Sequence, residues 1–264
     1  MKSVLIKLGG SVITDIAYRK SILRQVVELS NSGYSISIVH GGGKLITSYM
    51  DKLGIKSEYF EGLRITPDET LDVVMMVLIG KVNKDIVKDL TFMNVKALGL
   101  CGGDVNLINC KKLEVEAQID LGKVGVPVAV NKEFYDQIIL LGCIPVIATI
   151  ALGNDSYYNI NADHTAAFMA QELGVDHLIF VSDVDGVLHP ETKERFELLD
   201  KEKIHYLKNE GIIKSGMLPK LQSCIEALEK GVSKVTILNG KKHNAIIDAI
   251  TKEESVGTEI LLKS

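Results

Sequence analysis

The feature that most constrains the fold of this chain is a series of short apolar runs, each ending in glycine or a polar residue. Val, Ile and Leu fill these runs almost without the polar alternation of half-exposed strands. Continuous runs of this kind are typical of strands buried on both faces, as in parallel sheets. They occupy residues 3–10, 35–43, 95–104, 144–150, 177–186, 234–240 and 258–262.

Helical patterns lie between the runs. The clearest covers residues 66–90, where Thr66 is the expected N-cap, Pro67 the first helical residue and Glu69 the partner in a capping box. Further helices are expected at 131–142, 163–174 and 219–231, the first beginning at Asn131 and all three ending at a glycine. In the last helix, an i, i+3, i+4, i+7 stripe predicts a buried face made of Leu221, Cys224, Ile225 and Leu228.

Alternating strands and helices require crossover connections. They predict an α/β fold, a three-layer α/β/α sandwich with a mainly parallel central sheet. Residues 105–130 are polar, contain glycines and alternate more, which predicts one or two β-hairpins projecting from that sheet. The 264 residues suit a single domain with two lobes, and a weak seam near residue 175 divides 1–174 from 175–264.

Composition excludes several classes of function. The net charge is −4 and Lys and Arg form no dense cluster, which argues against a nucleic-acid binder. The four cysteines (Cys101, Cys110, Cys143 and Cys224) are far apart and form no C-x-x-C pair, so we expect reduced thiols and no metal site. The N-terminal run is too short for a signal peptide or a membrane span, so the cytoplasm is the expected compartment.

The segment SIVHGGGKLITS, residues 37–48, looks like half of a phosphate-binding P-loop. The P-loop pattern G-x-x-x-x-G-K-[ST] would place its first glycine at Ile38 and its hydroxyl at Leu45, so the pattern fails twice. Ligands of open parallel sheets nevertheless bind at the carboxyl ends of strands. The glycine turns at 9–10 and 41–43 follow two such ends. They are tight strand-to-helix turns, or backbone N–H cradles for an anion.

Several polar residues also stand out near strand ends or helix starts. Lys7 interrupts an apolar strand, which favours a cation aimed at a ligand over one that reaches solvent. Lys220 stands in a first helical turn, where the helix dipole disfavours a cation and a ligand anion would explain it. Arg64 is a lone surface arginine or a fork for a carboxylate. Alternation predicts that Asn159, Asn161 and Asp163 share one side of an extended segment, although one of them suffices as a helix cap.

The chain resembles the acetylglutamate kinases of the amino-acid kinase superfamily. The resemblance rests on an ordered set of motifs that covers essentially the whole sequence: KLGG, HGGG, GLRIT, LIGKVNKDIV, ALGLCGGDVNLI, YNINAD, SDVDGVL, SGMLPK and VGTEIL. KLGGSVITD alone would also fit isopentenyl phosphate kinases, whereas GLRIT together with NINAD points to the acetylglutamate branch.

The resemblance implies a role for each matching residue. Lys7 and Lys220 would stabilise the transferring phosphoryl group, Gly10 and Gly42 would donate N–H groups to it, and Asp163 would position the lysines. Gly42, Gly43, Arg64 and Asn159 would bind the acetylated amino acid. The adenine nucleotide would be bound by Asp183, Val184, Asp185, Gly186, Val187, Leu188, Ile212, Ile213 and Lys214.

The implied reaction is phosphorylation of the side-chain carboxylate of N-acetyl-L-glutamate by ATP, the second step of arginine biosynthesis. Mg²⁺ would be held mainly by the ATP phosphates. A carboxylate is already ionised at neutral pH, so no general base is required. Asp163 as a base is the weaker alternative. The implied partners are N-acetyl-L-glutamate and ATP, without nucleic acid or membrane.

Other functions remain open on the sequence. A related kinase could act on carrier-bound aminoadipate or glutamate, or on isopentenyl phosphate, and a non-catalytic amino-acid sensor could retain the fold. The presence of Lys7, Asp163 and Lys220 disfavours the sensor. Arginine-inhibited members of the family carry an extra N-terminal helix that joins dimers into hexamers. The chain starts almost at its first strand, so we expect a homodimer without arginine feedback.

Overall fold

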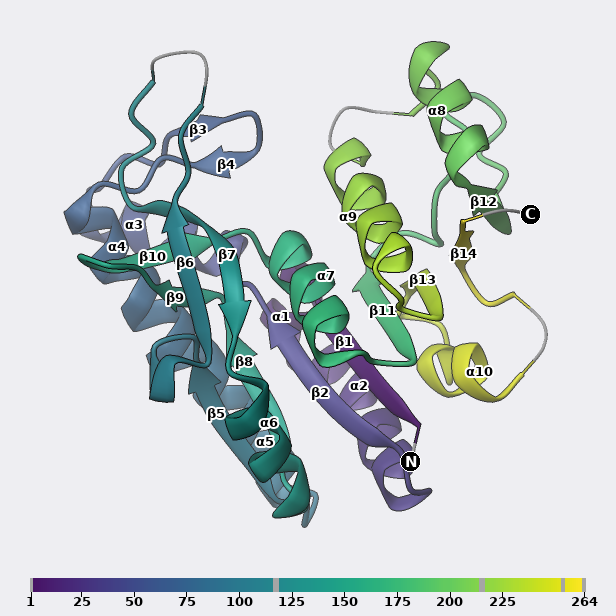
Figure 1. Cartoon of the computed structure of the whole chain (residues 1–264), viewed down its shortest axis with the longest axis horizontal. Coiled ribbons are helices and arrows are strands. Elements are labelled where there is room, and N and C mark those ends of the chain that lie inside the picture. Colours follow the sequence, from purple (N-terminus) through teal and green to yellow (C-terminus); the bar gives the residue numbers. More distant parts are fainter. Residues whose placement is uncertain (1, 116–118, 214–216, 253–254, 263–264) are drawn as a thin grey trace. The chain divides into compact units, whose positions relative to one another are not determined.

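The computed structural model describes residues 2–115, 119–213, 217–252 and 255–262 (Figure 1). It divides into two compact units. Unit 1 contains Met1–Ile36 and Ala166–Ser264, and unit 2 contains Ser37–Thr165. Strand β2 (Ser35–His40) runs from unit 1 into unit 2, and helix α7 (Ala162–Leu173) runs back.

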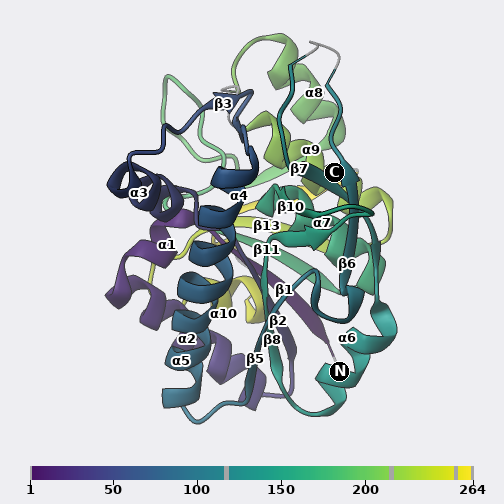
Figure 2. The same cartoon turned by 90° about the vertical axis from the view of Figure 1, so that its left-hand side faces the viewer.

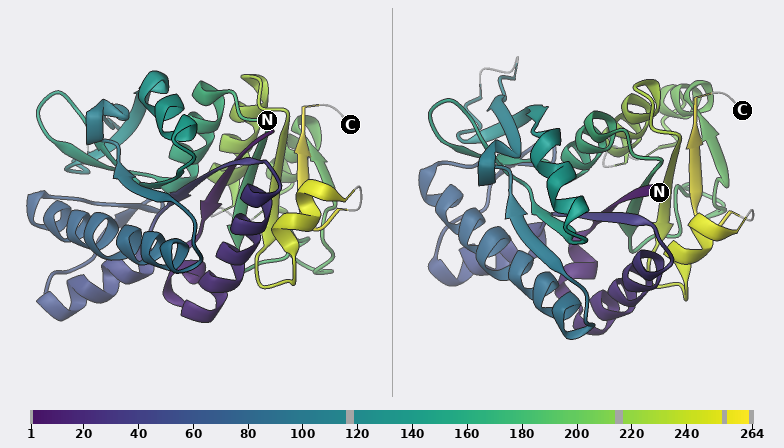
Figure 3. Two further views of the ribbon diagram at one scale, coloured as in Figure 1. Left: turned by 90° about the horizontal axis from the view of Figure 1, so that it is seen from below. Right: turned by 60° about the horizontal axis from the view of Figure 1, so that its bottom comes forward.

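Unit 1 is built on a mostly parallel sheet with the strand order β12-β14-β13-β11-β1, in which only β13 and β14 pair antiparallel. These strands are β1 (Ser3–Leu8), β11 (His177–Ser182), β12 (Leu198–Asp200), β13 (Lys234–Asn239) and β14 (Thr258–Leu261). Its helices are α1 (Gly10–Thr14), α2 (Ile16–Asn31), α8 (Lys201–Asn209), α9 (Leu218–Glu229) and α10 (Ala245–Thr251). Helices α2 and α10 cover one face of the sheet and α9 the other, which gives three layers (Figure 3).

Unit 2 combines a parallel sheet with a small barrel. The sheet has the order β2-β8-β5, with β8 at Ile144–Ala148 and β5 at Ala97–Cys101. The closed barrel has the order β10-β7-β6-β9 and consists of β6 (Ile108–Lys112), β7 (Val124–Val130), β9 (Ile150–Leu152) and β10 (Tyr157–Ile160). A short hairpin pairs β3 (Tyr59–Phe60) with β4 (Leu63–Arg64).

The helices of unit 2 are α3 (Gly43–Leu53), α4 (Asp68–Met75), α5 (Lys84–Phe92), α6 (Lys132–Leu140) and the short 3₁₀ segment η2 (Asp104–Asn106). Between α4 and α5 lies the π-helical segment η1 (Met76–Asn83), and the three form one continuous rod in Figure 2. A π-helical segment is wider than an α-helix and shifts the side chains that follow it. Leu78 and Val82 of η1 are the side chains nearest to Gly42 in the turn after β2.

The apolar runs do form strands, and the fold class is confirmed. Every run of the sequence contains a strand of the main sheets. Inner strands such as β8 and β11 are buried on both faces, as their composition requires, whereas β5 lies at a sheet edge and its Leu98 is exposed. The stripe predicted on α9 is confirmed, since all four of its residues are buried. The predicted stops are also confirmed, because Gly142, Gly174 and Gly231 have the positive φ angles typical of residues after a helix.

The predicted start of the 66–90 helix is wrong in detail. The helix begins at Asp68 with Pro67 as N-cap, and no side chain caps it. Thr66 is instead fully buried, and its hydroxyl donates to the Arg64 carbonyl at 2.7 Å. The Thr66 backbone bridges to Gly122, and Lys123 N–H donates to its carbonyl at 2.6 Å. At Thr66, a β-bridge to Gly122 is therefore formed in place of the predicted capping box.

The hairpin predicted in residues 105–130 is confirmed, because β6 and β7 pair antiparallel. Its incorporation into a closed barrel with β9 and β10 was not predicted. Within the ranges that the structure describes, no helix is long and apolar enough to cross a membrane.

Candidate active site

The two lysines singled out in the sequence are both neighbours of one aromatic residue, Phe180. Lys7 is the register partner of Phe180 in the parallel pair β1–β11, so both side chains leave the same face of the sheet. Lys220 lies in the first turn of α9, and its Nζ is 4.9 Å from the centre of the Phe180 ring. Phe180 itself is fully buried. Unit 1 thus gathers two cations near one apolar surface, where their attraction for an anion is less screened than in water.

The strand ends next to these lysines are held close together. Gly9 N–H donates to the Val181 carbonyl at 3.1 Å, and a Cβ on Gly9 would lie only 3.0 Å from that oxygen. Gly10 then begins α1. At the end of the neighbouring strand β11, the Ser182 carbonyl accepts a hydrogen bond of 2.9 Å from the hydroxyl of Tyr18, a residue of helix α2. Burial raises the pKa of Tyr18 to about 12. The turn at residues 9–10 is therefore fixed by backbone contacts that leave no room for a side chain at Gly9.

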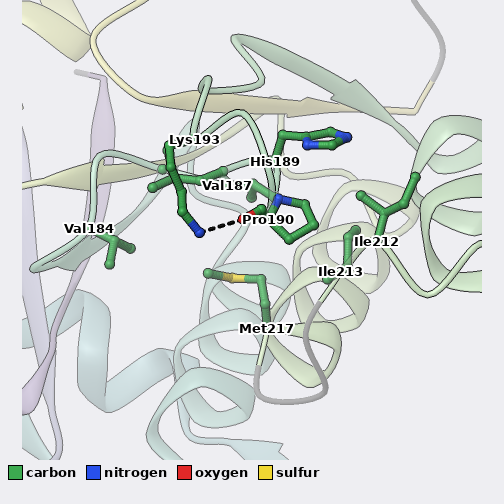
Figure 4. Close-up of a pocket in the computed structure, with 10 residues that line it drawn as sticks. Val184, Val187, His189, Pro190, Lys193, Ile212, Ile213 and Met217 are labelled. Carbon is green, nitrogen blue, oxygen red and sulfur yellow. Dashed lines mark hydrogen bonds between the residues drawn. The ribbon is translucent and has the colours of Figure 1, made fainter.

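Unit 1 also contains a cavity of about 210 Å³ beside the carboxyl end of β11. Figure 4 shows Val187 and Pro190 on one side of it and Met217 on another. Of the predicted nucleotide-binding residues, Val184, Gly186, Val187, Leu188, Ile212 and Ile213 line the cavity. Asp183 and Asp185 belong to the same loop but do not line it, and Lys214 lies outside the described residues.

His189, Pro190, Lys193 and Met217 also line the cavity and were not predicted from the sequence. The first three directly follow the SDVDGVL motif, so extending that motif by a few residues would have found them. Met217 precedes α9 within SGMLPK. The lining is mainly aliphatic with a few polar groups at its edge, which suits a flat heteroaromatic ring.

The loop that borders this cavity is anchored to the strands behind it. Gly186 has φ +131°, and a Cβ there would lie 2.4 Å from Thr258 Oγ1. Thr258 Oγ1 in turn accepts from Val187 N–H at 2.8 Å. Asn239 Nδ2 donates to Asp185 at 2.9 Å, and this bond, followed by Lys242, holds the pKa of Asp185 below its ordinary value. Asp185 is thus an ionised anchor of the loop.

In unit 2, the glycine turn after β2 packs against the π-helical segment. A Cβ on Gly42 would lie 2.7 Å from Leu78 and 3.4 Å from Val82, both of η1. A Cβ on Gly43 would meet nothing within 4 Å, and the Gly43 surface is exposed. Gly42 is therefore required by packing alone, whereas the structure leaves open space at Gly43 for a ligand. Lys44, the residue that suggested a P-loop, is exposed on α3.

This difference makes Gly43→Ala and Gly42→Ala a matched pair. Gly43→Ala should leave the melting temperature unchanged or slightly higher, because alanine favours the first turn of α3. It should raise KM for the acceptor substrate at least about tenfold, since a methyl group costs that much where a ligand contacts the backbone. Gly42→Ala should lower both stability and activity. A Gly43→Ala enzyme with normal KM would remove this residue from the site.

Arg64 is buried in a network of its own unit rather than exposed. Its Nη1 donates to Ser57 Oγ at 2.8 Å and lies 3.2 Å from Met50 Sδ. Its Nη2 donates to Thr47 Oγ1 at 2.8 Å, to the Gly43 carbonyl at 3.1 Å and to the Tyr59 hydroxyl. The guanidinium is thereby tied directly to the glycine turn, and a carboxylate that binds it must displace some of these neutral acceptors.

The segment 159–163 is not one extended strand. Asn159 belongs to β10, and its Nδ2 donates to Thr66 Oγ1 at 3.2 Å. Asn161 caps α7, because its Oδ1 accepts from the N–H groups of Asp163 and His164 at 2.9 and 3.1 Å. Asp163 already lies in the first turn of that helix. The expectation that all three side chains share one side of an extended segment is therefore wrong, since helix α7 starts earlier than the alternation suggested.

Two buried histidines give the protein a pH-dependent stability. Burial lowers the pKa of His40 to about 4 and that of His177, which contacts Thr236 Oγ1 at 2.9 Å, to about 3. Unfolding returns both to about 6.5, so the unfolded chain binds more protons below that pH. The unfolding free energy should therefore fall as pH drops from about 6.5 toward 4.

Urea unfolding at pH 7 and pH 5 measures this effect. Each histidine should account for about 2 kcal/mol of the loss. The control is His177→Gln, for which the loss between the two pH values should shrink by that amount. An equal loss in the wild type and in this variant would contradict the assignment of His177 as a neutral buried group.

The site residues thus form two sets, one in each unit. Lys7, Gly10, Lys220 and the cavity-lining residues belong to unit 1, and Gly42, Gly43, Arg64, Asn159 and Asp163 belong to unit 2. Among the residues placed by the structure, no group of three or more His, Cys, Asp or Glu side chains is arranged to hold a metal ion.

Comparison with known proteins agrees with this chemistry. The Amino acid kinase family matches residues 2–239. The acetylglutamate kinase of Clostridioides difficile (strain 630) is 39% identical over 262 residues, which cover 98% of this chain and 91% of that protein. The acetylglutamate kinase of Hydrogenobaculum sp. (strain Y04AAS1) is 41% identical over 268 residues, covering 99% of this chain and 92% of the relative.

Solved structures show the same fold. A protein called smu.665 from Streptococcus mutans UA159 superposes with a TM-score of 0.83 at 24% identity, covering 99% of both chains. N-acetylglutamate synthase from Neisseria gonorrhoeae, complexed with coenzyme A and N-acetyl-glutamate, superposes with a TM-score of 0.88 at 20% identity, and the match covers 100% of this chain and 60% of that one. The chain belongs to the amino acid kinase family and, within it, to the acetylglutamate kinases.

Proposed function

We propose that this chain transfers the γ-phosphoryl group of ATP to the side-chain carboxylate of N-acetyl-L-glutamate. A carboxylate oxygen forms the new O–P bond, the bond from the γ-phosphorus to the bridging oxygen breaks, and ADP leaves with that electron pair. The products are N-acetyl-L-glutamyl 5-phosphate and ADP. This reaction is the second step of arginine biosynthesis. The observation that carries the proposal is the pair Lys7 and Lys220 at Phe180, in a chain of this family.

The main barrier to this reaction is charge repulsion. The acceptor carboxylate and the triphosphate are both negative, and the transferring group spreads further charge over its oxygens. Lys7 and Lys220 supply fixed positive charge beside a buried ring, where it acts more strongly than in water. Backbone N–H groups of Gly10 and Gly42 add neutral donors. When bound, Mg²⁺ held mainly by the nucleotide phosphates would offset further charge.

No proton has to be removed from the acceptor. A glutamate side chain has an ordinary pKa near 4.3 and is ionised at neutral pH. Asp163 therefore acts in this proposal by orienting the two lysines rather than as a base.

The acceptor is held by the set of residues in unit 2. Arg64 matches the planar geometry of a carboxylate and would take the α-carboxylate. Gly42, Gly43 and Asn159 would contact the rest of the acylated amino acid. The link from Arg64 Nη2 to the Gly43 carbonyl couples the two halves of this subsite.

ATP would occupy the aliphatic cavity of unit 1, with the segment 183–188 and residues 212–214 along the nucleotide. The assignment of residues 1–174 to the acyl amino acid and 175–264 to ATP belongs to the same proposal. So do a cytoplasmic location and a homodimer.

A hydroxylamine trap tests the function. Hydroxylamine converts an acyl phosphate to a stable hydroxamate, so the purified protein is incubated with ATP, Mg²⁺ and one acceptor at a time. We expect hydroxamate from N-acetyl-L-glutamate and little from free glutamate, which lacks the acetyl group. Turnover of isopentenyl phosphate without hydroxamate from N-acetyl-L-glutamate would overturn the proposal in favour of the other kinase.

A further inference from the structure

The glycine turn of unit 2 is attached to a buried polar pair that has no place in the chemistry described so far. His40, the last residue of β2, and Asn83, the last residue of η1, are both fully buried. Asn83 Nδ2 lies 3.2 Å from His40 Nε2, and His40 Nδ1 lies 3.0 Å from the Gly41 carbonyl oxygen. A chain of two contacts thus runs from the π-helical segment to the first glycine of the turn.

The orientation of the Asn83 amide follows from its other neighbours. Its Nδ2 lies 2.8 Å from the Val146 carbonyl and 3.3 Å from the Leu100 carbonyl. Backbone carbonyls only accept hydrogen bonds, so the atom that faces them must be the NH₂ group. The same NH₂ group faces His40 Nε2, and that nitrogen must therefore be the acceptor.

The other end of the pair gives the same answer independently. The Gly41 carbonyl can only accept, so His40 Nδ1 must carry the proton that it receives. An imidazole with its proton on Nδ1 and a lone pair on Nε2 satisfies both contacts at once. The doubly protonated ring would place a proton against the Asn83 NH₂ group, which agrees with a pKa of His40 lowered to about 4 by burial.

The sheet is also shaped around Asn83. A Cβ on Gly99 of β5 would lie 2.1 Å from Asn83 Oδ1, so glycine at this position makes room for the amide. Asn83 Oδ1 is buried and accepts no hydrogen bond from the residues that the structure places. A buried amide oxygen without a donor is costly, and leucine would fill the same space. The NH₂ group of Asn83 offsets that cost, because it contacts His40 Nε2 and the Leu100 and Val146 carbonyls.

We propose that His40 is a positioning residue of the glycine turn, with Asn83 setting its tautomer. The neutral imidazole donates from Nδ1 to the Gly41 carbonyl and so fixes the rotation of the following peptide. That peptide carries the Gly42 N–H, the donor assigned above to the phosphoryl group. Packing of Leu78 and Val82 against Gly42 holds the other side of the turn. This role rests on the proposed function, because it acts through a group that contacts the substrate.

Two substitutions separate the two contacts of the ring. Asparagine at residue 40 can place its Nδ2 where His40 Nδ1 stands, keeping the donor to Gly41 and losing the contact with Asn83. Glutamine can place its Oε1 near the position of Nε2, keeping the acceptor for Asn83 and losing the donor. A purely structural histidine would suffer from either change to a similar extent.

The kinetic test compares His40→Asn and His40→Gln with the wild type. We expect His40→Asn to keep kcat within about threefold, and His40→Gln to lower kcat about tenfold, the usual value of one neutral hydrogen bond. KM for ATP should stay unchanged in both. Equal losses in the two variants, or a larger loss in His40→Asn, would overturn the proposal.

NMR of the histidine side-chain nitrogens in the wild type tests the tautomer without relying on activity or on the folding of a variant. We expect a neutral His40 ring protonated at Nδ1 at neutral pH, and a ring protonated at Nε2 would overturn the proposal. If the wild type gave no hydroxamate from N-acetyl-L-glutamate, the proposed function would fail. The tautomer would still be decided by this spectrum.

Discussion

Lys220→Ala should lower kcat by about 10²- to 10³-fold, the usual effect of removing one group that stabilises charge in a transition state. Lys220 lies in the first turn of α9 with its ammonium over the Phe180 ring, on the face of the sheet from which Lys7 projects. In the proposed function, its charge acts on the transferring phosphoryl group and not on the substrate carboxylates. KM for N-acetyl-L-glutamate should therefore change by no more than a few fold.

Lys230→Ala is the matched control for this experiment. Lys230 is an exposed residue at the C-cap of the same helix, far along α9 from its first turn. Its removal should leave kcat unchanged. A Lys220→Ala enzyme with near-normal kcat, measured by ADP release under saturating substrates, would remove Lys220 from the transition state.

Arg64→Lys should raise KM for N-acetyl-L-glutamate about 10- to 100-fold while kcat falls only a few fold. Lysine keeps the positive charge but loses the fork that grips a carboxylate through two parallel hydrogen bonds. Hydrogen bonds to charged groups contribute about 1.5–3 kcal/mol, which corresponds to this range of binding. KM for ATP should not change, because the hydrogen-bond partners described above for Arg64 all lie within unit 2.

A structural explanation of the same loss has to be separated from this one. Arg64 also holds Ser57, Thr47 and the Gly43 carbonyl, so its replacement affects the free protein. Tyr59→Phe is the control, since it removes one neutral partner of the guanidinium and leaves the fork intact. It should keep KM within about threefold. If Tyr59→Phe raised KM as much as Arg64→Lys, the network and not the fork would bind the acceptor.

The sequence predicted those parts of the fold that depend on local pattern. Continuous apolar runs marked the strands because burial on both faces leaves no alternation. The glycines after the helices were equally informative, since residues such as Gly142 and Gly174 adopt a backbone conformation that other residues avoid. At Thr66 the local signal failed, because a β-bridge to Gly122 fixes the backbone that a capping box would need.

The arrangement of the site depends on contacts that sequence spacing does not contain. The register of two strands far apart in the chain places Lys7 beside Phe180, and the packing of α9 brings Lys220 to the ring of the same residue. Likewise, the π-helical segment has the composition of an ordinary helix, and nothing in its sequence shows that its Leu78 packs on Gly42. The polar pair of His40 and Asn83 gave no signal in either periodicity or spacing. It emerges only when β2 and η1 are placed together.

The central claim is that the acceptor atom is an oxygen of the side-chain carboxylate. N-acetyl-L-glutamate labelled with oxygen-18 only in that carboxyl group tests it directly. After transfer from ATP, hydroxylamine attacks the acyl carbon and releases phosphate together with the bridging oxygen. Mass spectrometry should then find one heavy oxygen in the released phosphate, in a yield equal to the hydroxamate formed. Phosphate that contains no heavy oxygen would show transfer to water or to another group and would contradict the account.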